Sequence, residues 1–275
     1  MIRGQDMKVP IVDAVKGNVG QVELPPQFSE ELHPDLIARA VLSIESKQRQ
    51  PYGTDPMAGK RYSAKLSRRR RNFKGAYGIG ISRVPRKTIS RSGTRFNWVG
   101  ALAPGTVGGR QAQPPKAEKI WVKKINKAEN RKAIRSAIAA TAMPGIVKLR
   151  GHLIPKDYPF VVATSMEALN KTKSVVEALN KFGLESELVR VSTRKIRAGK
   201  GKNRNRKYTE KKGPLVVVST GDCSLARSAR NIVGIEVAVV HRLNAHLLAP
   251  GTAPGRLTLF TEAAIERLNK EKLFV

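Results

Sequence analysis

Residues 46–116 interleave arginine, lysine, glycine and aromatic residues. Side chains of these types, alternating in this way, can bind another molecule through both charge and ring stacking. Arginine forks pair with phosphate oxygens, glycine lets the backbone approach closely, and aromatic rings stack on unpaired bases. The segment holds six of the chain's 14 aromatic residues. The pattern predicts RNA binding, with base-stacking candidates at Tyr52, Tyr62, Phe73, Tyr77, Phe96 and Trp98.

The positive charge of the chain is concentrated in two stretches. The 275 residues include 52 Lys and Arg against 21 Asp and Glu, a formal net charge of +31. Residues 46–116 have 17 basic residues and one acid, Asp55, and residues 190–213 have 11 basic residues and one acid, Glu210. The other 180 residues carry a net charge of only +5. A compact body with this excess would repel itself, so a polyanionic partner is implied, either a nucleic acid or an anionic membrane.

Two sets of basic residues are the candidates for contacts with an RNA backbone. The first, within residues 46–116, comprises Lys60, Arg61, Arg68, Arg69, Arg70, Arg71, Lys74, Arg83, Arg86, Lys87, Arg91, Arg95, Arg110 and Lys116. The second, within residues 192–213, comprises Arg194, Lys195, Arg197, Lys200, Lys202, Arg204, Arg206 and Lys207. For the run Arg68 to Arg71 taken alone, a solvated basic tail or a localisation signal remains an alternative.

A membrane partner, a metal and a cofactor are not expected. No run approaches the roughly 18 apolar residues of a membrane span, and residues 1–10 lack the apolar core of a signal peptide. Residues 46–116 also lack the continuous apolar face of an interfacial helix. The spacing of His241 and His246 does not place two ligands on one helix face. The single cysteine, Cys223, fits a reducing compartment.

Residues 1–45 and 117–275 have the pattern of one globular domain. Strands are predicted at residues 8–13, 20–24, 160–163, 188–191, 215–219, 236–240 and 256–260. Helices are predicted at residues 34–44, 126–142, 165–182, 224–231 and 261–273. Strands that alternate with helices predict an α/β fold, here a three-layer sandwich with a mostly parallel sheet. One face of the helix at 126–142 is basic and is either solvated or rests on phosphates: Lys127, Arg131, Lys132 and Arg135.

The pattern of residues 46–116 does not predict a helix or sheet layer of the globular domain. They contain only eight Leu, Ile or Val residues, ten of the 23 glycines and six of the 16 prolines, with no sustained period. Such a segment buries too little apolar area to offset its ordering entropy. We interpret it as a long irregular basic extension, an RNA-binding arm that becomes ordered inside RNA. Residues 192–213 are interpreted as a secondary basic loop of the globular domain, between two strands.

The catalytic alternative is an RNA-modifying or nucleotide-dependent enzyme on the α/β domain. The glycines of GAYGIG, residues 75–80, lack the spacing of a dinucleotide fold, and no P-loop, G-x-S-x-G or H-E-x-x-H motif occurs. Asp222, Cys223 and Ser224 follow a predicted strand, where an α/β enzyme would place a site. A helix cap at Asp222 or Ser224 and a small buried Cys223 explain them more simply. A chromatin-like DNA binder would show a groove-reading helix or a dimerising seam, and the sequence has neither. We therefore expect no enzyme and no homo-oligomer.

Several motifs occur along the chain in a characteristic order: Tyr52-Gly53 followed by Pro56, Ala58 and Gly59, then SRVPRK (82–87), VGGRQAQPPKAEK (107–119), RSAIAATA (135–142), RGH (150–152) and APGTAPGRLTLFTEAAI (249–265). Together these motifs resemble a known family, the archaeal and eukaryotic branch of large-subunit ribosomal protein four (the L-four family). The resemblance covers essentially the whole chain, and the last two long motifs are highly specific. The length is similar to that of archaeal members.

The resemblance implies a structural constituent of the large ribosomal subunit, located in the cytoplasm within the ribosome. Its partners would be large-subunit rRNA, neighbouring ribosomal proteins and, near the tip of the arm, the nascent peptide. The family places an α/β domain on the outside of the subunit and threads a long extension toward the wall of the nascent-peptide exit tunnel. By position, the tip falls at residues 67–81, with tunnel candidates Arg70, Arg71, Asn72 and Phe73. Family tips are usually rich in Gly and Ser, whereas this tip carries four arginines and a phenylalanine.

Overall fold

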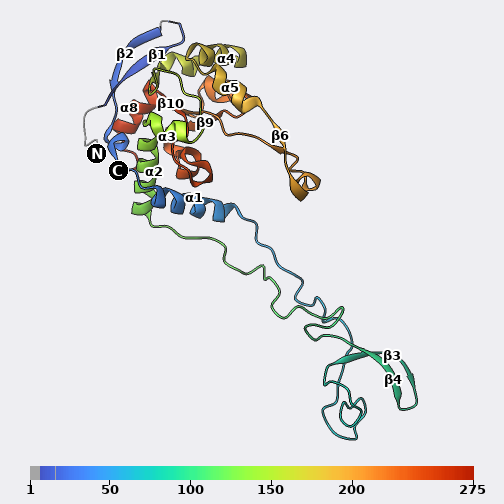
Figure 1. The fold of residues 1–275 in the computed structure, drawn as a ribbon. Coiled ribbons are helices and arrows are strands. Elements are labelled where there is room, and N and C mark those ends of the chain that lie inside the picture. Colours follow the sequence, from blue (N-terminus) through green and yellow to red (C-terminus); the bar gives the residue numbers. More distant parts are fainter. Residues whose placement is uncertain (1–6, 16) are drawn as a thin grey trace. The chain divides into compact units, whose positions relative to one another are not determined.

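The computed structural model describes residues 7–15 and 17–275, and the chain divides into two compact units (Figure 1). Unit 1 is formed by Met1–Gln48 and Val122–Val275, and unit 2 is formed by Arg49–Trp121. The division follows the composition, because the apolar periodic segments lie in unit 1 and most of the basic, glycine-rich sequence lies in unit 2.

Unit 1 is built on a six-stranded sheet with the strand order β2-β1-β5-β10-β8-β9. The strands are β1 (Lys8–Asp13), β2 (Gly17–Glu23), β5 (Val161–Val162), β8 (Leu215–Val218), β9 (Glu236–Val239) and β10 (Thr258–Thr261). The edge pair β1–β2 is antiparallel and every other pair is parallel. The predicted α/β fold with a mostly parallel sheet is confirmed.

Helices and 3-10 turns connect these strands. The α-helices of unit 1 are α1 (Pro34–Gln48), α2 (Lys127–Thr141), α3 (Pro144–Leu149), α4 (Thr172–Lys181), α5 (Glu185–Ser192), α6 (Ser224–Ser228), α7 (Ala245–Leu248) and α8 (Glu262–Lys270). The 3-10 turns are η1 (Pro26–Ser29), η2 (Thr164–Ala168), η3 (Gly199–Arg204), η4 (Val240–Arg242) and η5 (Pro250–Thr252). Thr261 ends β10 and caps α8, because its hydroxyl accepts a hydrogen bond from the Ala264 N–H.

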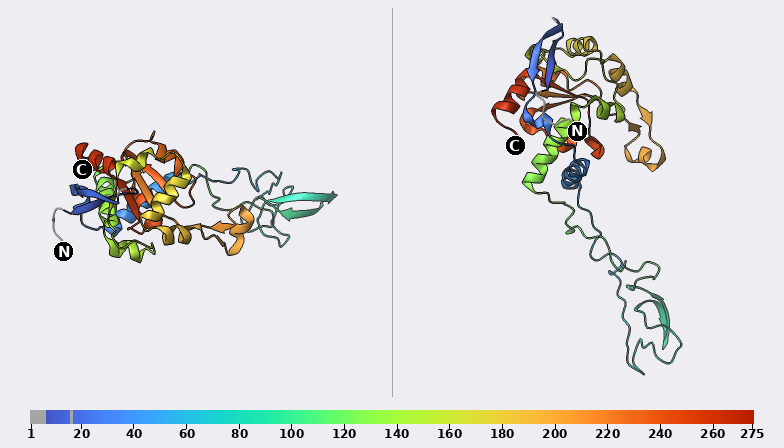
Figure 2. Two further views of the ribbon diagram at one scale, coloured as in Figure 1. Left: turned by 90° about the horizontal axis from the view of Figure 1, so that it is seen from above. Right: turned by 60° about the vertical axis from the view of Figure 1, so that its left-hand side comes forward.

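Each face of the sheet contributes to its own hydrophobic cluster. Along β8, Leu215 and Val217 belong to one cluster and Val216 and Val218 to the other, as the two-residue period of a doubly covered strand requires. Helices α1, α2, α7 and α8 pack residues into the first cluster, and α3, α4 and α6 pack residues into the second. Figure 2 shows helices on both sides of the sheet.

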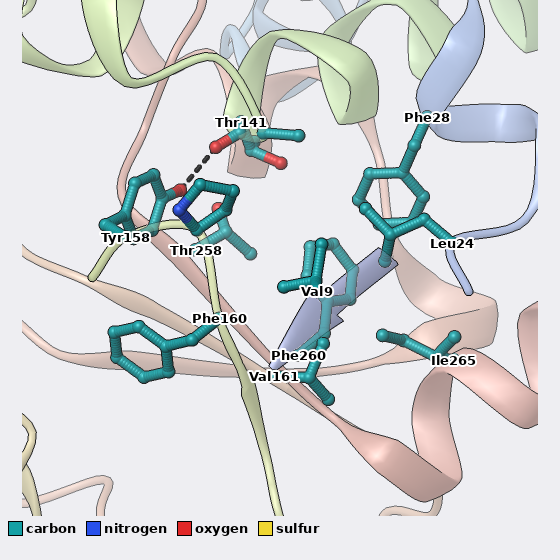
Figure 3. Close-up of a pocket in the computed structure, with 12 residues that line it drawn as sticks. Val9, Leu24, Phe28, Thr141, Tyr158, Phe160, Val161, Thr258, Phe260 and Ile265 are labelled. Atoms are coloured by element: carbon teal, nitrogen blue, oxygen red, sulfur yellow. Dashed lines mark hydrogen bonds between the residues drawn. The ribbon is translucent and has the colours of Figure 1, made fainter. Parts of the chain in front are cut away.

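Side chains of both clusters pack closely around a small cavity. Phe28 meets Phe260 edge to face with ring centroids 5.2 Å apart, and the Tyr158 hydroxyl donates a hydrogen bond to the Thr141 carbonyl oxygen (Figure 3). Burial raises the pKa of Tyr158 well above its ordinary value. The cavity between these side chains has a volume of about 20 Å³, which is a packing space and far below that of a ligand site.

Three sequence-based expectations for unit 1 are wrong. The helix expected at residues 165–182 is divided into η2 and α4, and the strand expected at residues 188–191 lies inside helix α5. Leu184 and Val191 are both buried and seven residues apart, which is two helical turns, so their spacing fits a helix better than a strand. Neither Asp222 nor Ser224 caps α6, because the N-cap position is taken by the half-buried Cys223.

Unit 2 contains a β-hairpin that the composition did not predict. Strand β3 (Arg86–Ser92) pairs with β4 (Arg95–Gly100) in antiparallel register, with a turn at Gly93, whose φ is +53°. The burial of β4 alternates, with Phe96 and Trp98 half-buried between exposed neighbours. Because only two large side chains carry this alternation, it is hidden among charged residues in the sequence.

Candidate nucleic-acid interface

Three of the predicted stacking residues come together on the unit 2 hairpin. Phe96 stacks on Trp98 with centroids 5.2 Å apart, and Phe73 meets Phe96 edge to face at 5.3 Å. Arg91 lies over Phe73, with its Cζ 5.0 Å from the ring centroid, and Arg86 lies 5.5 Å from the Trp98 centroid. Phe73 remains 57% exposed, so this aromatic and cationic cluster presents one large apolar ring to a partner.

The other predicted aromatics each lie beside a cation. The Lys87 Nζ is 4.0 Å from the Tyr62 centroid, and Arg83 donates a 3.2 Å hydrogen bond to the Tyr77 hydroxyl. Cation–π contacts of this kind hold a ring and a charge in one place without neutralising the charge. Unit 2 therefore presents paired rings and cations, which suits a partner with both bases and phosphates.

Tyr52 takes part in a contact that the sequence analysis missed. It stacks on Trp121 at 5.5 Å, and the Arg49 Cζ lies 3.7 Å from the Trp121 centroid, with the Lys119 Nζ at 4.3 Å. Arg49 and Tyr52 are about 70 residues from Trp121 in the chain. Aromatic residues near both ends of the basic segment were the available signal, but a pairing over that separation cannot be read from composition.

Two glycines allow the limbs of unit 2 to lie against each other. A Cβ at Gly53 would lie 2.4 Å from the Ala117 backbone nitrogen, and a Cβ at Gly59, where φ is +73°, would lie 2.6 Å from the Arg110 backbone. The Thr54 N–H donates a 3.0 Å hydrogen bond to the Pro115 carbonyl oxygen. The motifs at residues 52–59 and 107–119 are thus the two sides of one close backbone pairing, which explains the glycines at positions 53 and 59.

The run Arg68 to Arg71 lies in a small closed loop. The Ser67 N–H donates to the Lys74 carbonyl oxygen at 3.0 Å, and the Gly75 N–H donates to the Asn72 carbonyl oxygen at the same distance. All four arginines are exposed, and none has an ion pair within the described part of the chain. In contrast, Arg61 of the same unit pairs with Asp55. The loop therefore holds four cations available to a polyanion.

The second basic stretch forms a hairpin in unit 1. Strands β6 (Lys195–Ile196) and β7 (Tyr208–Thr209) flank η3, and the hairpin stands away from the sheet (Figures 1 and 2). It lies between helix α5 and strand β8, so the expectation of two flanking strands is wrong on one side. We call residues 193–212 the basic hairpin.

Two of the candidate cations of the basic hairpin are engaged inside it. Arg194 pairs with Glu210 at 3.0 Å, and the Arg197 Nε donates to the Arg206 carbonyl oxygen at 3.2 Å. The remaining six are exposed and lack an ion pair among the residues described: Lys195, Lys200, Lys202, Arg204, Arg206 and Lys207. The hairpin therefore presents most of its charge outward.

The basic face of α2 is partly used within the protein. Arg135 pairs with Glu30 at 2.6 Å and donates a 2.7 Å hydrogen bond to the Phe274 carbonyl oxygen. Arg131 donates a 3.0 Å hydrogen bond to the Val275 carbonyl oxygen. Two of the four basic residues, Arg131 and Arg135, therefore bind residues 274–275 of the same chain. The sequence left two alternatives for this face, solvation or phosphate binding, and this intramolecular role is neither of them.

The carboxyl ends of the parallel strands, where α/β enzymes usually hold ligands, have a structural arrangement here. Glu167 accepts hydrogen bonds from the Ser219 N–H at 2.9 Å, the Ser219 hydroxyl at 2.7 Å and the Thr261 hydroxyl at 2.6 Å. The glutamate thereby joins the ends of β8 and β10. Nearby, burial raises the pKa of the Cys223 thiol, which makes it a poorer nucleophile.

A buried acid lies at the foot of the basic hairpin. Glu187 of α5 is fully buried; its carboxylate accepts two hydrogen bonds from Arg190, at 2.7 and 2.6 Å, and lies 2.7 Å from His152 Nδ1. Although burial alone would raise the pKa of Glu187, the contacts with Arg190, His152 and the Leu153 N–H lower it to about 2.

This depressed pKa predicts a stability change in acid. A carboxyl group whose pKa is lower in the folded state stabilises the fold above its ordinary pKa of about 4.3, and that stabilisation is lost as the pH falls toward 2. We expect Glu187→Gln to lower the unfolding free energy by about 3 kcal/mol at pH 6. The difference between variant and wild type should shrink as the pH falls from 5 to 2, measured by thermal unfolding. Glu210→Gln, in an exposed ion pair, is the control, and a pH-independent difference for Glu187→Gln would contradict the assignment.

Within residues 7–15 and 17–275, no helix has both the length and the apolar character needed to cross a membrane. In the same residues, His, Cys, Asp and Glu side chains do not gather in groups of three or more that could hold a metal ion.

The chain is similar to archaeal proteins along nearly its whole length. Residues 22–271 match the model of the Ribosomal protein L4/L1 family. The chain is 50% identical over 268 residues to the large ribosomal subunit protein uL4 of Nanoarchaeum equitans, covering 98% of this chain and 100% of that protein. Identity to the uL4 protein of Archaeoglobus fulgidus is 42% over 266 residues, covering 96% and 99%. Identity to that of Methanoculleus marisnigri is 45% over 251 residues, covering 91% and 94%. The resemblance seen in the motifs is confirmed, and the chain belongs to the ribosomal protein L4/L1 family.

Proposed function

We propose that this protein is a structural constituent of the large ribosomal subunit that binds and stabilises large-subunit rRNA. The observation that carries the proposal is the location of the charge. Residues 46–116 have a net charge of +16, with exposed arginines and ring–cation pairs, in a chain whose relatives are large-subunit proteins. Neighbouring ribosomal proteins are its further partners, and its place is within the ribosome.

The mechanism is electrostatic and non-catalytic. Residues 46–116 act as an rRNA-binding arm whose cations screen phosphate repulsion where RNA helices converge, and residues 192–213 act as a second contact. Rings such as Phe73 stack on unpaired bases in irregular loops. Residues 1–45 and 117–275 form the globular domain that anchors the arm.

The finer assignment concerns the tip of the arm. We propose that the loop around Arg70, Arg71, Asn72 and Phe73 lies in the wall of the nascent-peptide exit tunnel, where it meets the nascent peptide. Two features support this: the position of the loop within the family pattern, and its closure by the hydrogen bonds of Ser67 and Gly75, which presents these side chains on a compact turn.

Sedimentation tests the proposed function directly. The tagged chain, expressed in an archaeal host, is expected to remain with large subunits after a wash in high salt, because contacts with many phosphates are cooperative once the subunit is assembled. A variant without residues 49–121 should be released at lower salt. If the full chain stays at the top of the gradient with free proteins, the proposed function is wrong.

Unit 1 is expected to fold without unit 2. The Ser43 hydroxyl donates to the Lys123 carbonyl oxygen at 2.7 Å, and the Lys123 N–H donates to the Ser46 hydroxyl at 2.9 Å. These contacts hold the two ends of the removed segment together, so a short Gly-Ser linker can replace residues 49–121. We expect the midpoint of thermal unfolding to change by less than about 3 °C. Both hydrophobic clusters consist of unit 1 residues, so the deletion removes none of their side chains. Loss of the cooperative transition would contradict this.

A further inference from the structure

The basic hairpin has two feet, and one side chain joins them. The outgoing foot is the end of helix α5, which carries Arg190, and the returning foot is Lys212. The Arg190 guanidinium holds the buried Glu187 carboxylate with two nitrogens, and its Nη2 also donates a 2.9 Å hydrogen bond to the Lys212 carbonyl oxygen. Arg190 therefore cross-links residues that are 22 positions apart.

The returning foot is held a second time, through the half-buried Glu236 and the buried Arg256. The Lys212 ammonium pairs with Glu236, and the other oxygen of Glu236 accepts a 2.7 Å hydrogen bond from Arg256 Nη1. Arg256 is fully buried, and its Nε donates to the Gly213 carbonyl oxygen at 2.9 Å. Two consecutive residues of the foot are thus fixed, one through its side chain and one through its backbone.

The backbone at Gly213, next to this foot, is closely packed against a neighbouring segment. The Gly213 N–H donates a 3.0 Å hydrogen bond to the Gly234 carbonyl oxygen, and a Cβ at residue 213 would lie 2.7 Å from that oxygen. On the other side, His152 and the Leu153 N–H hold Glu187, so the contacts begin in the RGH motif and end at Arg256. The RGH motif at residues 150–152 and the motif at residues 249–265, which contains Arg256, both lie outside the cationic surfaces described above.

We propose that this set of contacts, His152–Glu187–Arg190 with Lys212–Glu236–Arg256, is a positioning device that presents the basic hairpin to RNA phosphates in one fixed orientation. The inference rests on the proposed function. Its physical basis is that a flexible loop with six free cations loses conformational entropy when it binds, whereas a hairpin fixed at both feet has lost much of it already. Arg190 and Arg256 are then positioning residues that act through the hairpin and need not touch RNA.

The test uses the full-length protein and a transcript of archaeal large-subunit rRNA. Arg190→Gln removes the cross-link between the feet and is expected to weaken binding about tenfold in a filter-binding assay. Trypsin should also cleave within residues 194–212 faster. Because Arg190→Gln leaves the buried Glu187 carboxylate with fewer partners, the midpoint of thermal unfolding also falls, so binding and cleavage are measured below the onset of the variant's unfolding. The matched control is Arg39→Gln, which also removes one charge from an ion pair of unit 1 but leaves the hairpin feet intact.

A double-mutant cycle separates positioning from direct contact. Lys200→Ser, Lys202→Ser and Arg204→Ser together remove exposed charge from the hairpin. If Arg190 acts only by positioning these cations, Arg190→Gln adds little to the loss of affinity in that background. An equal loss in both backgrounds would overturn the proposal, as would wild-type affinity and an unchanged cleavage rate in Arg190→Gln.

Two further arms keep the test decisive. If Arg190→Gln does not fold, Arg190→Lys retains the charge near Glu187 but lacks the fork that reaches both acceptors, so weakened binding is expected and wild-type binding overturns the proposal. If the wild-type protein fails to bind the transcript, the proposed function fails. The trypsin arm still decides whether the contacts fix the hairpin.

Discussion

Replacement of Arg68, Arg69, Arg70 and Arg71 with serine is expected to lower the salt dependence of rRNA binding by up to about 3 in the slope of log K against log salt concentration. The four side chains are exposed and have no ion pair among the described residues, so each is available to displace a counterion from a phosphate. With an unchanged intercept at 1 M salt, that slope corresponds to about a thousandfold weaker binding at 0.1 M. Filter binding over a salt series measures it.

The control for this variant removes equal charge from unit 1. Lys171, Lys173, Lys181 and Arg230 are exposed and lie outside both basic stretches, so their replacement with serine should leave the slope nearly unchanged. An equal fall in slope for both variants would mean that net charge alone sets the affinity. An unchanged slope for the arginine variant would remove Arg68 to Arg71 from the RNA interface and favour the solvated-tail alternative.

Gly53→Ala is expected to open the backbone pairing of unit 2. The added Cβ would lie 2.4 Å from the Ala117 backbone nitrogen, and a backbone atom cannot move aside as a flexible side chain would. The hydrogen bond from Thr54 to Pro115 and the stacking of Tyr52 on Trp121 should be lost with it. We expect thermolysin to cleave unit 2 at least about tenfold faster, which corresponds to roughly 1.4 kcal/mol in the opening equilibrium.

Tryptophan fluorescence gives a second measurement of the same change. The chain has two tryptophans, Trp98 and Trp121, so the Trp98→Phe background reports on Trp121 alone. In that background Gly53→Ala should shift the emission to longer wavelength as the ring becomes solvated. Gly145→Ala is the matched control, because it adds the same methyl group where no atom lies within 4 Å and where the backbone is outside the left-handed region. Emission that responds equally to both variants would argue against the close pairing.

Unit 1 shows how far local patterns predict a fold. Strand β8 is four consecutive apolar residues between Pro214 and Ser219, and helix α1 repeats its buried residues at Ile37, Ala40 and Val41, so both were predictable from the sequence pattern. Helix α5 was not, because Leu188 and Val191 in a short window fit either a strand or a helix. The difference was settled by the packing of Leu184 and Val191 within the fold.

Unit 2 was harder to predict, for a different physical reason. Its few large apolar side chains pair with each other over long separations, as Phe73 does with Phe96, and no periodic run announces such a pairing. The glycines at residues 53 and 59 were visible in the motifs, but their purpose depends on which backbone lies opposite them.

By itself, the sequence determined the composition of the binding surface: the two basic stretches, the aromatic residues among them and the nearly neutral α/β remainder. These properties depend only on which residues are neighbours in the sequence, so charge counts and local patterns are enough to interpret them. Only the tertiary structure decided which cations are free. Arg197, Arg131 and Arg135 are drawn to carbonyl and carboxylate oxygens inside the protein, whereas Arg68 to Arg71 are not. A hydrogen bond needs its acceptor within about 3 Å, and that proximity between distant residues exists only after the chain has folded.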